Sequence, residues 1–262
     1  MKRTEVPVVS VPGFIRPESG MLSLGSCFAE NIGLRLCKAG YDISVNPPGI
    51  LFNPFSIETA LRNAIRRSVE KQHFDSFQGT SIHFDYHSRM NGADESAVNK
   101  NVEKASGIME SRLLSGDRLF ITFGTSWVFQ LNRTGKIIAN CHRVPQKEFT
   151  KVLLDCDDLK QSWFGLLSEL LALNPKLRIV LTVSPVRHTR KGIHENNVSK
   201  AILLLLCDHL EKSFEQVHYF PAYEIVLDEL RDYRFFKDDL IHPNDEALEI
   251  VYNRFVASYC GV

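Results

Sequence analysis

Residues 22–31 read LSLGSCFAEN, and this stretch decides how we interpret the rest of the chain. The apolar run before the glycine predicts a short buried strand, and the pattern after it predicts a helix. In an α/β protein such a junction lies at the carboxyl end of the sheet, where ligands bind. The turn carries a hydroxyl and a thiol side by side, on Ser26 and Cys27. It therefore predicts a candidate nucleophile at the edge of a sheet.

A second motif lies near the other end of the sequence, where Asp239 and His242 stand three residues apart in the run DDLIHP. A catalytic base needs an acceptor on its second ring nitrogen, and a loop aspartate at i−3 can supply it. The two motifs together predict a triad of Ser26 as nucleophile, His242 as base and Asp239 as orienting carboxylate. Plainer roles also fit, because a serine before a helix commonly caps it and the Asp–His loop could lie at the surface.

Other side chains compete for the same roles. Cys27 is a rival nucleophile, because a thiol at a helix N-terminus has a lowered pKa, although small buried cysteines are common. His188 also follows a predicted strand and is an alternative base. His142 follows a predicted hairpin and could reach the site or simply pack. Ser199 and Lys200 open a long predicted helix, where N-terminal capping is the ordinary role.

Two more patterns could serve chemistry. Gly49 and Gly124 each follow a predicted strand and could lend a backbone N–H to an oxyanion hole, to which Ser126 could add its hydroxyl. Turn chemistry is the alternative for all three. A separate alternation places metal-ligating side chains at i, i+2 and i+4, namely His83, Asp85 and His87. On a strand they would share one face, but a solvated strand face looks the same, so we predict no metal site.

Apolar runs of about five residues alternate with helical patterns along the chain, which favours a parallel sheet covered on both faces. The expected strands are 21–24, 42–45, 118–123, 177–183 and 217–220. The expected helices are 28–38, 56–70, 97–114, 146–173, 195–214, 223–232 and 245–259. Residues 71–145 break the alternation, with an expected strand at 81–88 and a hairpin of 127–131 with 136–141. We therefore predict a single α/β domain, 1–262, with an insertion in 71–145.

The bulk composition argues against several classes of protein. The 262 residues include 31 basic and 31 acidic side chains, so the net charge is zero and neither nucleic acid nor a membrane surface is an expected partner. Six cysteines without a C-x-x-C pair favour free thiols in a reducing compartment. No apolar segment typical of a secretory signal follows the first residues, so we expect a cytoplasmic protein. The sequence does not fix its oligomeric state.

Several blocks resemble those of the GSCFA domain family, which is named for the five letters at 25–29. The other similar blocks are NPPGI at 46–50, GTSW at 124–127, NCHRVP at 140–145, SPVRH at 184–188 and DLIHP at 239–243. Together they span about residues 20–245. The family is in turn similar to the SGNH, or GDSL-type, hydrolases.

That resemblance implies a flavodoxin-like three-layer α/β/α sandwich with a mainly parallel sheet. It also implies that Ser26, His242 and Asp239 form the catalytic triad and that Gly49 belongs to the oxyanion hole. Two blocks depart from the hydrolase pattern. The usual Gly-Asp-Ser is Leu-Gly-Ser at 24–26, and the usual Gly-x-Asn is Gly-Thr-Ser at 124–126, so the oxyanion asparagine is missing.

The missing donor could be replaced by Ser126, by a backbone N–H or by His142. We predict a serine-dependent hydrolase of acyl esters, acting on a small acylated substrate with a carbohydrate as one candidate, and no cofactor. One alternative is an O-acyltransferase that uses the same triad and passes the acyl group to a sugar hydroxyl. Another is a catalytically weak or inactive carbohydrate-binding or scaffold domain on a hydrolase fold.

Overall fold

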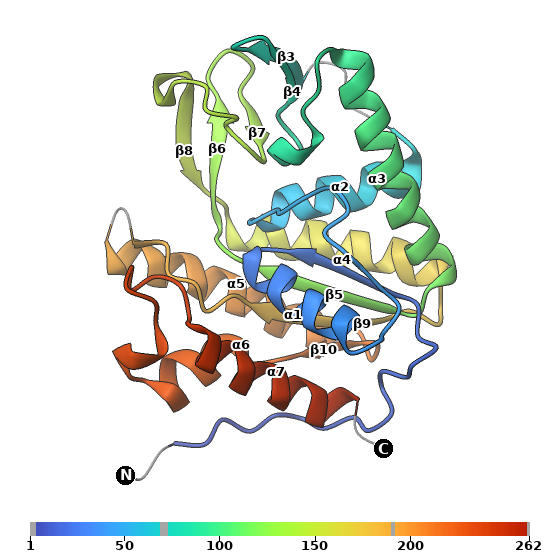
Figure 1. Cartoon of the computed structure of the whole chain (residues 1–262), viewed down its shortest axis with the longest axis vertical. Helices are drawn as coiled ribbons and strands as arrows, with labels where there is room; N and C mark the ends of the chain where they lie inside the picture. The colour runs from blue at the N-terminus through green and yellow to red at the C-terminus, as the bar shows by residue number, and fades with distance from the viewer. Residues whose placement is uncertain (1–3, 69–72, 190–191, 261–262) are drawn as a thin grey trace.

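A computed structural model describes residues 4–68, 73–189 and 192–260 (Figure 1). Its central sheet has five parallel strands, in the order β2-β1-β5-β9-β10. Their bounds are β1 (Met21–Gly25), β2 (Ile43–Val45), β5 (Arg118–Phe123), β9 (Arg178–Val183) and β10 (Val217–Tyr219). Counted in chain order, this is the 2-1-3-4-5 arrangement of flavodoxin-like folds. The prediction of a parallel α/β sheet is confirmed.

Helices cover both faces of this sheet (Figure 1). One layer holds α1 (Cys27–Lys38), α6 (Ala222–Glu224) and α7 (Asp245–Tyr259), and the other holds α2 (Pro54–Arg66), α3 (Glu95–Ser115), α4 (Cys156–Leu173) and α5 (Ile193–Ser213). Adjacent residues of β5 show the division, because Phe120 packs in the first layer and Ile121 in the second. The expected three-layer sandwich is confirmed. Within the described ranges, no helix has the length and apolar character needed to cross a membrane.

Two small antiparallel sheets stand outside the sandwich, at the top of Figure 1. One is the hairpin of β3 (Phe74–Phe77) and β4 (Thr80–His83). The other is β7-β6-β8, with β6 (Trp127–Leu131), β7 (Lys136–Ile138) and β8 (Phe149–Leu153). The β6–β7 hairpin was expected. The added region differs from 71–145, since α3 and β5 belong to the sandwich and β8 follows residue 145; residues 71 and 72 lie outside the described ranges.

Four local predictions were wrong, in whole or at one end. The segment 149–153 was expected to be helical but forms β8, because pairing with β6 outweighs its local pattern. The expected strand 81–88 ends at His83, where the Phe84 amide turns to donate to His73 O. The expected helix 223–232 becomes α6 followed by a π-helical turn, Ile225–Leu230. The expected helix 56–70 ends at Arg66, and residues 69 and 70 lie outside the described ranges.

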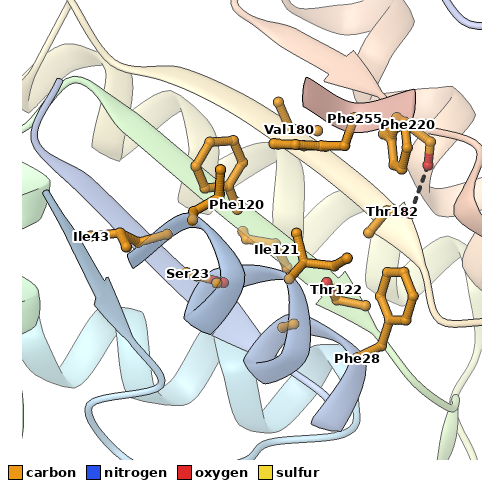
Figure 2. A pocket seen from close by; sticks show the side chains of 14 residues that line it. Ser23, Phe28, Ile43, Phe120, Ile121, Thr122, Val180, Thr182, Phe220 and Phe255 are labelled. Carbon is orange, nitrogen blue, oxygen red and sulfur yellow. Dashed lines mark hydrogen bonds between the residues drawn. The ribbon is translucent and has the colours of Figure 1, made fainter. Parts of the chain in front are cut away.

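A small apolar cavity lies between α1 and the sheet, and Figure 2 shows the side chains around it. Its walls include Phe28, Phe120 and Phe255, and its volume is about 30 Å³. A single water molecule takes up about that much space in the liquid. The cavity is therefore a small packing gap in the first layer, and a substrate site has to be sought at the edge of the sheet.

Candidate active site

The turn after β1 depends on a glycine. Gly25 has a φ of +135°, and a Cβ at this position would lie 2.2 Å from Thr122 O on β5. Only glycine allows so close an approach in this conformation. The Gly25 amide donates to Asn46 Oδ1 at 2.9 Å, and its carbonyl accepts from Leu51 N at 3.0 Å. These bonds tie the loop after β2 to the turn that carries Ser26.

Ser26 is the N-cap of α1. Its Oγ accepts a hydrogen bond from Phe28 N at 3.3 Å, and its amide donates to Thr122 O at 3.2 Å. The residue is only 1% exposed. The capping role considered from the sequence is therefore present, with the hydroxyl held inward. The role of Ser26 as nucleophile stays a prediction.

The Asp239–His242 pair is formed. His242 Nδ1 and Asp239 Oδ2 are 2.7 Å apart, and Asp239 Oδ1 accepts from the amides of Ile241 at 2.9 Å and His242 at 3.0 Å. The His242 amide, followed by its ring, lowers the pKa of Asp239 to about 2. An ionised Asp239 holds the proton on Nδ1, so Nε2 carries the lone pair that a base needs. Both side chains are nearly half exposed, so Nε2 belongs to an accessible imidazole.

The loop that carries His242 is attached to the loop after β9. The Arg187 amide donates to Ile241 O at 3.1 Å, and the Arg187 guanidinium lies 4.3 Å from the centre of the Phe236 ring. Both halves of the expected triad thus lie at the carboxyl edge of the same sheet. In the part of the chain that the structure describes, however, no hydrogen bond joins Ser26 to His242.

His188 lies close enough to His242 to be affected by its charge, and its ring packs edge-on against Phe52. Its ring centre lies 6.3 Å from that of Phe52, whose carbonyl accepts the amide of Gly124. Burial lowers the pKa of His188 to about 3, and the positive charges of Lys200 and His242 contribute further. A ring that stays neutral at this pKa is a weak base. His188 is therefore a poorer candidate for the base than the carboxylate-paired histidine.

Sequence reasoning gave Lys200 only an ordinary role at the start of a long helix and missed that this lysine is buried. Lys200 on α5 is 1% exposed, and its Nζ donates to Gly124 O and Ser184 O, both at 2.6 Å. It thereby links the carboxyl ends of β5 and β9. Burial lowers the pKa of Lys200 to about 7. One feature of the sequence could have indicated that Lys200 faces the sheet. Asn196 and Lys200 are four residues apart and so share one helix face, but this spacing also fits simple capping.

The expected oxyanion donors already have acceptors within the protein. The amide of Gly49 donates to Asn46 O at 2.8 Å, and that of Gly124 to Phe52 O at 2.7 Å. Ser126 is fully buried; its amide donates to Ser199 Oγ at 2.8 Å and its hydroxyl to Ser199 O at 3.2 Å. Their part in an oxyanion hole stays a prediction, and each would have to exchange its present acceptor for a substrate oxygen.

His142 lies in the added region. Its Nε2 donates to His83 O at 3.0 Å, and its ring packs edge-on against Phe84 with centres 6.0 Å apart. The residue is 6% exposed. The residues that His142 contacts here lie in β4 and in the turn after it. They are not the residues that contact Ser26 or His242. None of these contacts supports the prediction that His142 reaches the catalytic groups.

The structure does not place His83, Asp85 and His87 on one strand face, as the metal-binding alternative requires. Because β4 ends at His83, Asp85 and His87 do not continue a strand face. Asp85 Oδ1 instead pairs with His73 Nδ1 at 2.6 Å, and His87 Nδ1 accepts from Arg89 N at 3.2 Å. Among the described residues, no three His, Cys, Asp or Glu side chains are placed to hold a metal ion.

Cys27 does not have the lowered pKa that its place at a helix N-terminus predicted. Burial raises the pKa of its thiol above the ordinary value, although the amides of Phe28 and of Cys27 itself act in the opposite direction. Desolvation of a thiolate therefore outweighs the helix terminus at this position. This weakens the case for a thiol nucleophile.

Comparison with known proteins supports the family expected from the motifs. The sequence profile of the GSCFA family matches residues 20–255. No curated protein matches the chain significantly.

Three solved structures are distantly similar. A protein from Streptococcus pneumonia, provisionally described as a platelet activating factor, shares 11% identity over 91% of this chain and 84% of that one, with a TM-score of 0.46. An acetyl xylan esterase from the rumen bacterium Butyrivibrio proteoclasticus shares 12% over 97% and 64%, with a TM-score of 0.41. A carbohydrate esterase of family 3 from Talaromyces cellulolyticus shares 11% over 55% and 57%, with a TM-score of 0.33. The fold assignment rests on the strand order above.

Proposed function

This chain belongs to the GSCFA family, and from that premise we propose that it is a serine-dependent hydrolase of acyl esters. The observation that carries the proposal is the hydrogen-bonded pair of Asp239 and His242, held against the loop after β9. Ser26 follows β1 at the same edge of the sheet. A nucleophile, a base and an orienting carboxylate are the parts that acyl transfer to water requires.

In the proposed reaction the Ser26 hydroxyl first leaves Phe28 N and turns toward His242 Nε2. Ser26 Oγ attacks the carbonyl carbon of the ester while Nε2 takes its proton. The imidazolium that forms is stabilised by Asp239 and then returns the proton to the leaving alcohol. Water attacks the acyl-serine in the same way, releases the acid and restores the hydroxyl.

Two groups contribute to stabilising the oxyanion in this proposal. One is an amide of Gly49 or Gly124, or the hydroxyl of Ser126, after the substrate oxygen displaces its present acceptor. The other is Lys200, which carries a positive charge below its pKa of about 7 and whose Nζ lies 2.6 Å from the carbonyl of Gly124, the residue packed against Ser26. A positive charge in a buried site acts over a longer range than one in water.

A second candidate function is a binding or scaffold domain without turnover. The observation that favours it is the state of Ser26, which is 1% exposed and uses its Oγ as a helix cap. A serine that only caps α1 would give the same local geometry. The two functions differ in one respect that can be measured, the reactivity of the Ser26 hydroxyl.

The test combines hydrolysis of p-nitrophenyl acetate with labelling by a fluorophosphonate. We expect turnover and a label on Ser26 in the unmodified chain, and neither in Ser26→Ala. Ser56→Ala is a matched control, because Ser56 is also buried at the start of a helix and its Oγ has no partner among the described residues. It should retain both signals.

Continued turnover and labelling in Ser26→Ala would overturn the assignment of the nucleophile. Complete absence of both signals from the unmodified chain, with a cooperative thermal transition, would favour the binding or scaffold function.

A further inference from the structure

A second cavity, of about 280 Å³, lies within the added region and apart from the residues of the proposed triad. It lies between the β3–β4 hairpin, the short helix η2 (Ser88–Met90) and the loop after β7. Its lining residues include Phe77, Gln78, Thr80, Ile82, Asn140 and Arg143. Small-molecule sites begin at about 300 Å³, so a ligand of this cavity has to be small.

Arg143 brings a permanent positive charge to the wall of the cavity. Its side chain is exposed, and no hydrogen bond or ion pair within the described ranges engages its guanidinium. A guanidinium stays protonated at neutral pH and presents a rigid fork of N–H donors. The other ionisable group of the wall is His142, whose pKa is lowered by burial, so its ring is neutral there. The cavity therefore offers one cation to a ligand and no carboxylate.

The carboxylates on and just after the β3–β4 hairpin already have partners. Asp75 on β3 pairs with Arg133 at 2.7 Å, and Asp85 pairs with His73 at 2.6 Å. Neither acidic residue lines the cavity. The charge of Arg143 is therefore not neutralised from this hairpin, and a negatively charged ligand would supply the missing partner.

A strained turn holds Arg143 at the cavity. The Val144 amide donates to Cys141 O at 2.9 Å, and the two residues between them, His142 and Arg143, have φ of +47° and +65°. Turns with two left-handed residues normally place glycine, asparagine or aspartate there. In the turn of the β3–β4 hairpin, Gln78 is also left-handed, with φ of +51°. Backbone strain of this kind concentrates at ligand sites, which fits a binding role for both turns.

The rest of the wall restricts the anion. Besides Arg143, the polar side chains of the wall include carboxamides and hydroxyls, which can donate to an oxygen of the ligand. A phosphate dianion would keep uncompensated charge beside a single cation. A carboxylate carries one charge and matches the guanidinium fork with two parallel hydrogen bonds. Phe77 and Ile82 offer apolar surface to the remainder of the ligand.

We propose that this cavity binds a small monocarboxylate, with its carboxylate on the Arg143 guanidinium and its apolar part against Phe77 and Ile82. The turn that carries Arg143 belongs to the NCHRVP block at 140–145, which has no part in the proposed triad. Binding at this site does not require turnover at Ser26.

The test measures binding of benzoate and butyrate at neutral pH by NMR titration of the ¹⁵N-labelled chain, with benzamide and butyramide as neutral isosteres. The members of each pair differ in charge but hardly in shape. At least one carboxylate should bind saturably and about tenfold or more tightly than its amide. The Arg143 backbone and Nε resonances should shift with it. The same binding should occur in Ser26→Ala, which separates this site from the esterase proposal.

Two pairs of variants locate the binding. Arg143→Gln removes the charge and should weaken carboxylate binding about tenfold or more. Arg231→Gln is its matched control and should leave binding unchanged, because Arg231 is also exposed and left-handed, with φ of +32°, but does not line the cavity. Ser88→Trp should block the cavity from an exposed lining position, whereas Ser76→Trp, exposed on β3 and outside the lining, should not.

The absence of saturable binding of both carboxylates at about 50 mM, which would saturate a site of millimolar Kd, would overturn the proposal. So would equal affinity for carboxylate and amide, unchanged binding in Arg143→Gln, or tighter binding of inorganic phosphate than of either carboxylate. Thermal unfolding of each variant checks that a loss of binding is not a loss of fold.

Discussion

The two halves of the proposed triad differ in how far each is prepared for chemistry. The Asp239–His242 pair is formed and nearly half exposed, with its carboxylate satisfied by two backbone amides and the imidazole. Ser26, in contrast, is buried, and its hydroxyl is occupied as a helix cap. The base is assembled within four residues of one loop. Access to the nucleophile, in contrast, depends on how α1 and the neighbouring loops cover Ser26.

The largest expected effect is the loss of activity when either half of the triad is removed. The two variants should differ in stability. We expect His242→Ala to lower kcat/KM for p-nitrophenyl acetate by about 10³-fold or more, as with Ser26→Ala. Because His242 is exposed, its loss should leave the free energy of unfolding almost unchanged. Ser26→Ala should in addition cost about 1 kcal/mol, because α1 loses its cap. Initial rates and urea unfolding of both variants provide the comparison; wild-type rates in His242→Ala would refute it.

The next effect concerns the turn that positions Ser26. Gly25→Ala should reduce the free energy of unfolding by about 3 kcal/mol, because the new Cβ meets Thr122 O at 2.2 Å and φ is +135°. The matched control is Gly107→Ala in α3, where a Cβ meets nothing within 4 Å and a gain of about 0.5–1 kcal/mol is expected. Chemical denaturation measures both; equal effects at the two glycines would contradict the described geometry.

An effect that is smaller at neutral pH distinguishes the buried lysine from both halves. The folded pKa of Lys200 is about 7, below the ordinary value for lysine, so between the two the unfolded chain binds a proton that the folded chain lacks. Stability relative to Lys200→Met should therefore rise as pH increases from about 7 toward 10, and stay level below 7. Melting temperatures of both proteins from pH 6 to 10 test this; parallel curves would show that Lys200 keeps an ordinary pKa.

The smallest effect is expected at the rival thiol. Cys27→Ala should retain esterase activity within about threefold, because burial raises the pKa of this thiol and Ser26 is the proposed nucleophile. Iodoacetamide should modify the exposed Cys37 before Cys27. Mass spectrometry of the alkylated chain gives the order, and loss of activity in Cys27→Ala that matches that of Ser26→Ala would transfer the nucleophile to the thiol.

Local patterns were sufficient where the interaction is local. The buried run at 118–123 is a strand with the expected bounds, because continuous apolar residues suit a strand covered on both faces. The pairing of Asp239 with His242 follows from a separation of three residues in one loop. By contrast, β8 was missed, because its identity as a strand comes from pairing with β6, about twenty residues earlier.

The amino-acid sequence by itself determined the order of the five sheet strands along the chain, the GSCFA family and the chemical groups available at the sheet edge, since these depend on residue type and short spacing. Only the tertiary structure decided that Lys200 joins β5 to β9, that Ser126 is bound to Ser199 and that His142 lies in another cavity. Hydrogen bonds between residues some 16 to 76 positions apart decide these placements, and no short spacing in the chain encodes them.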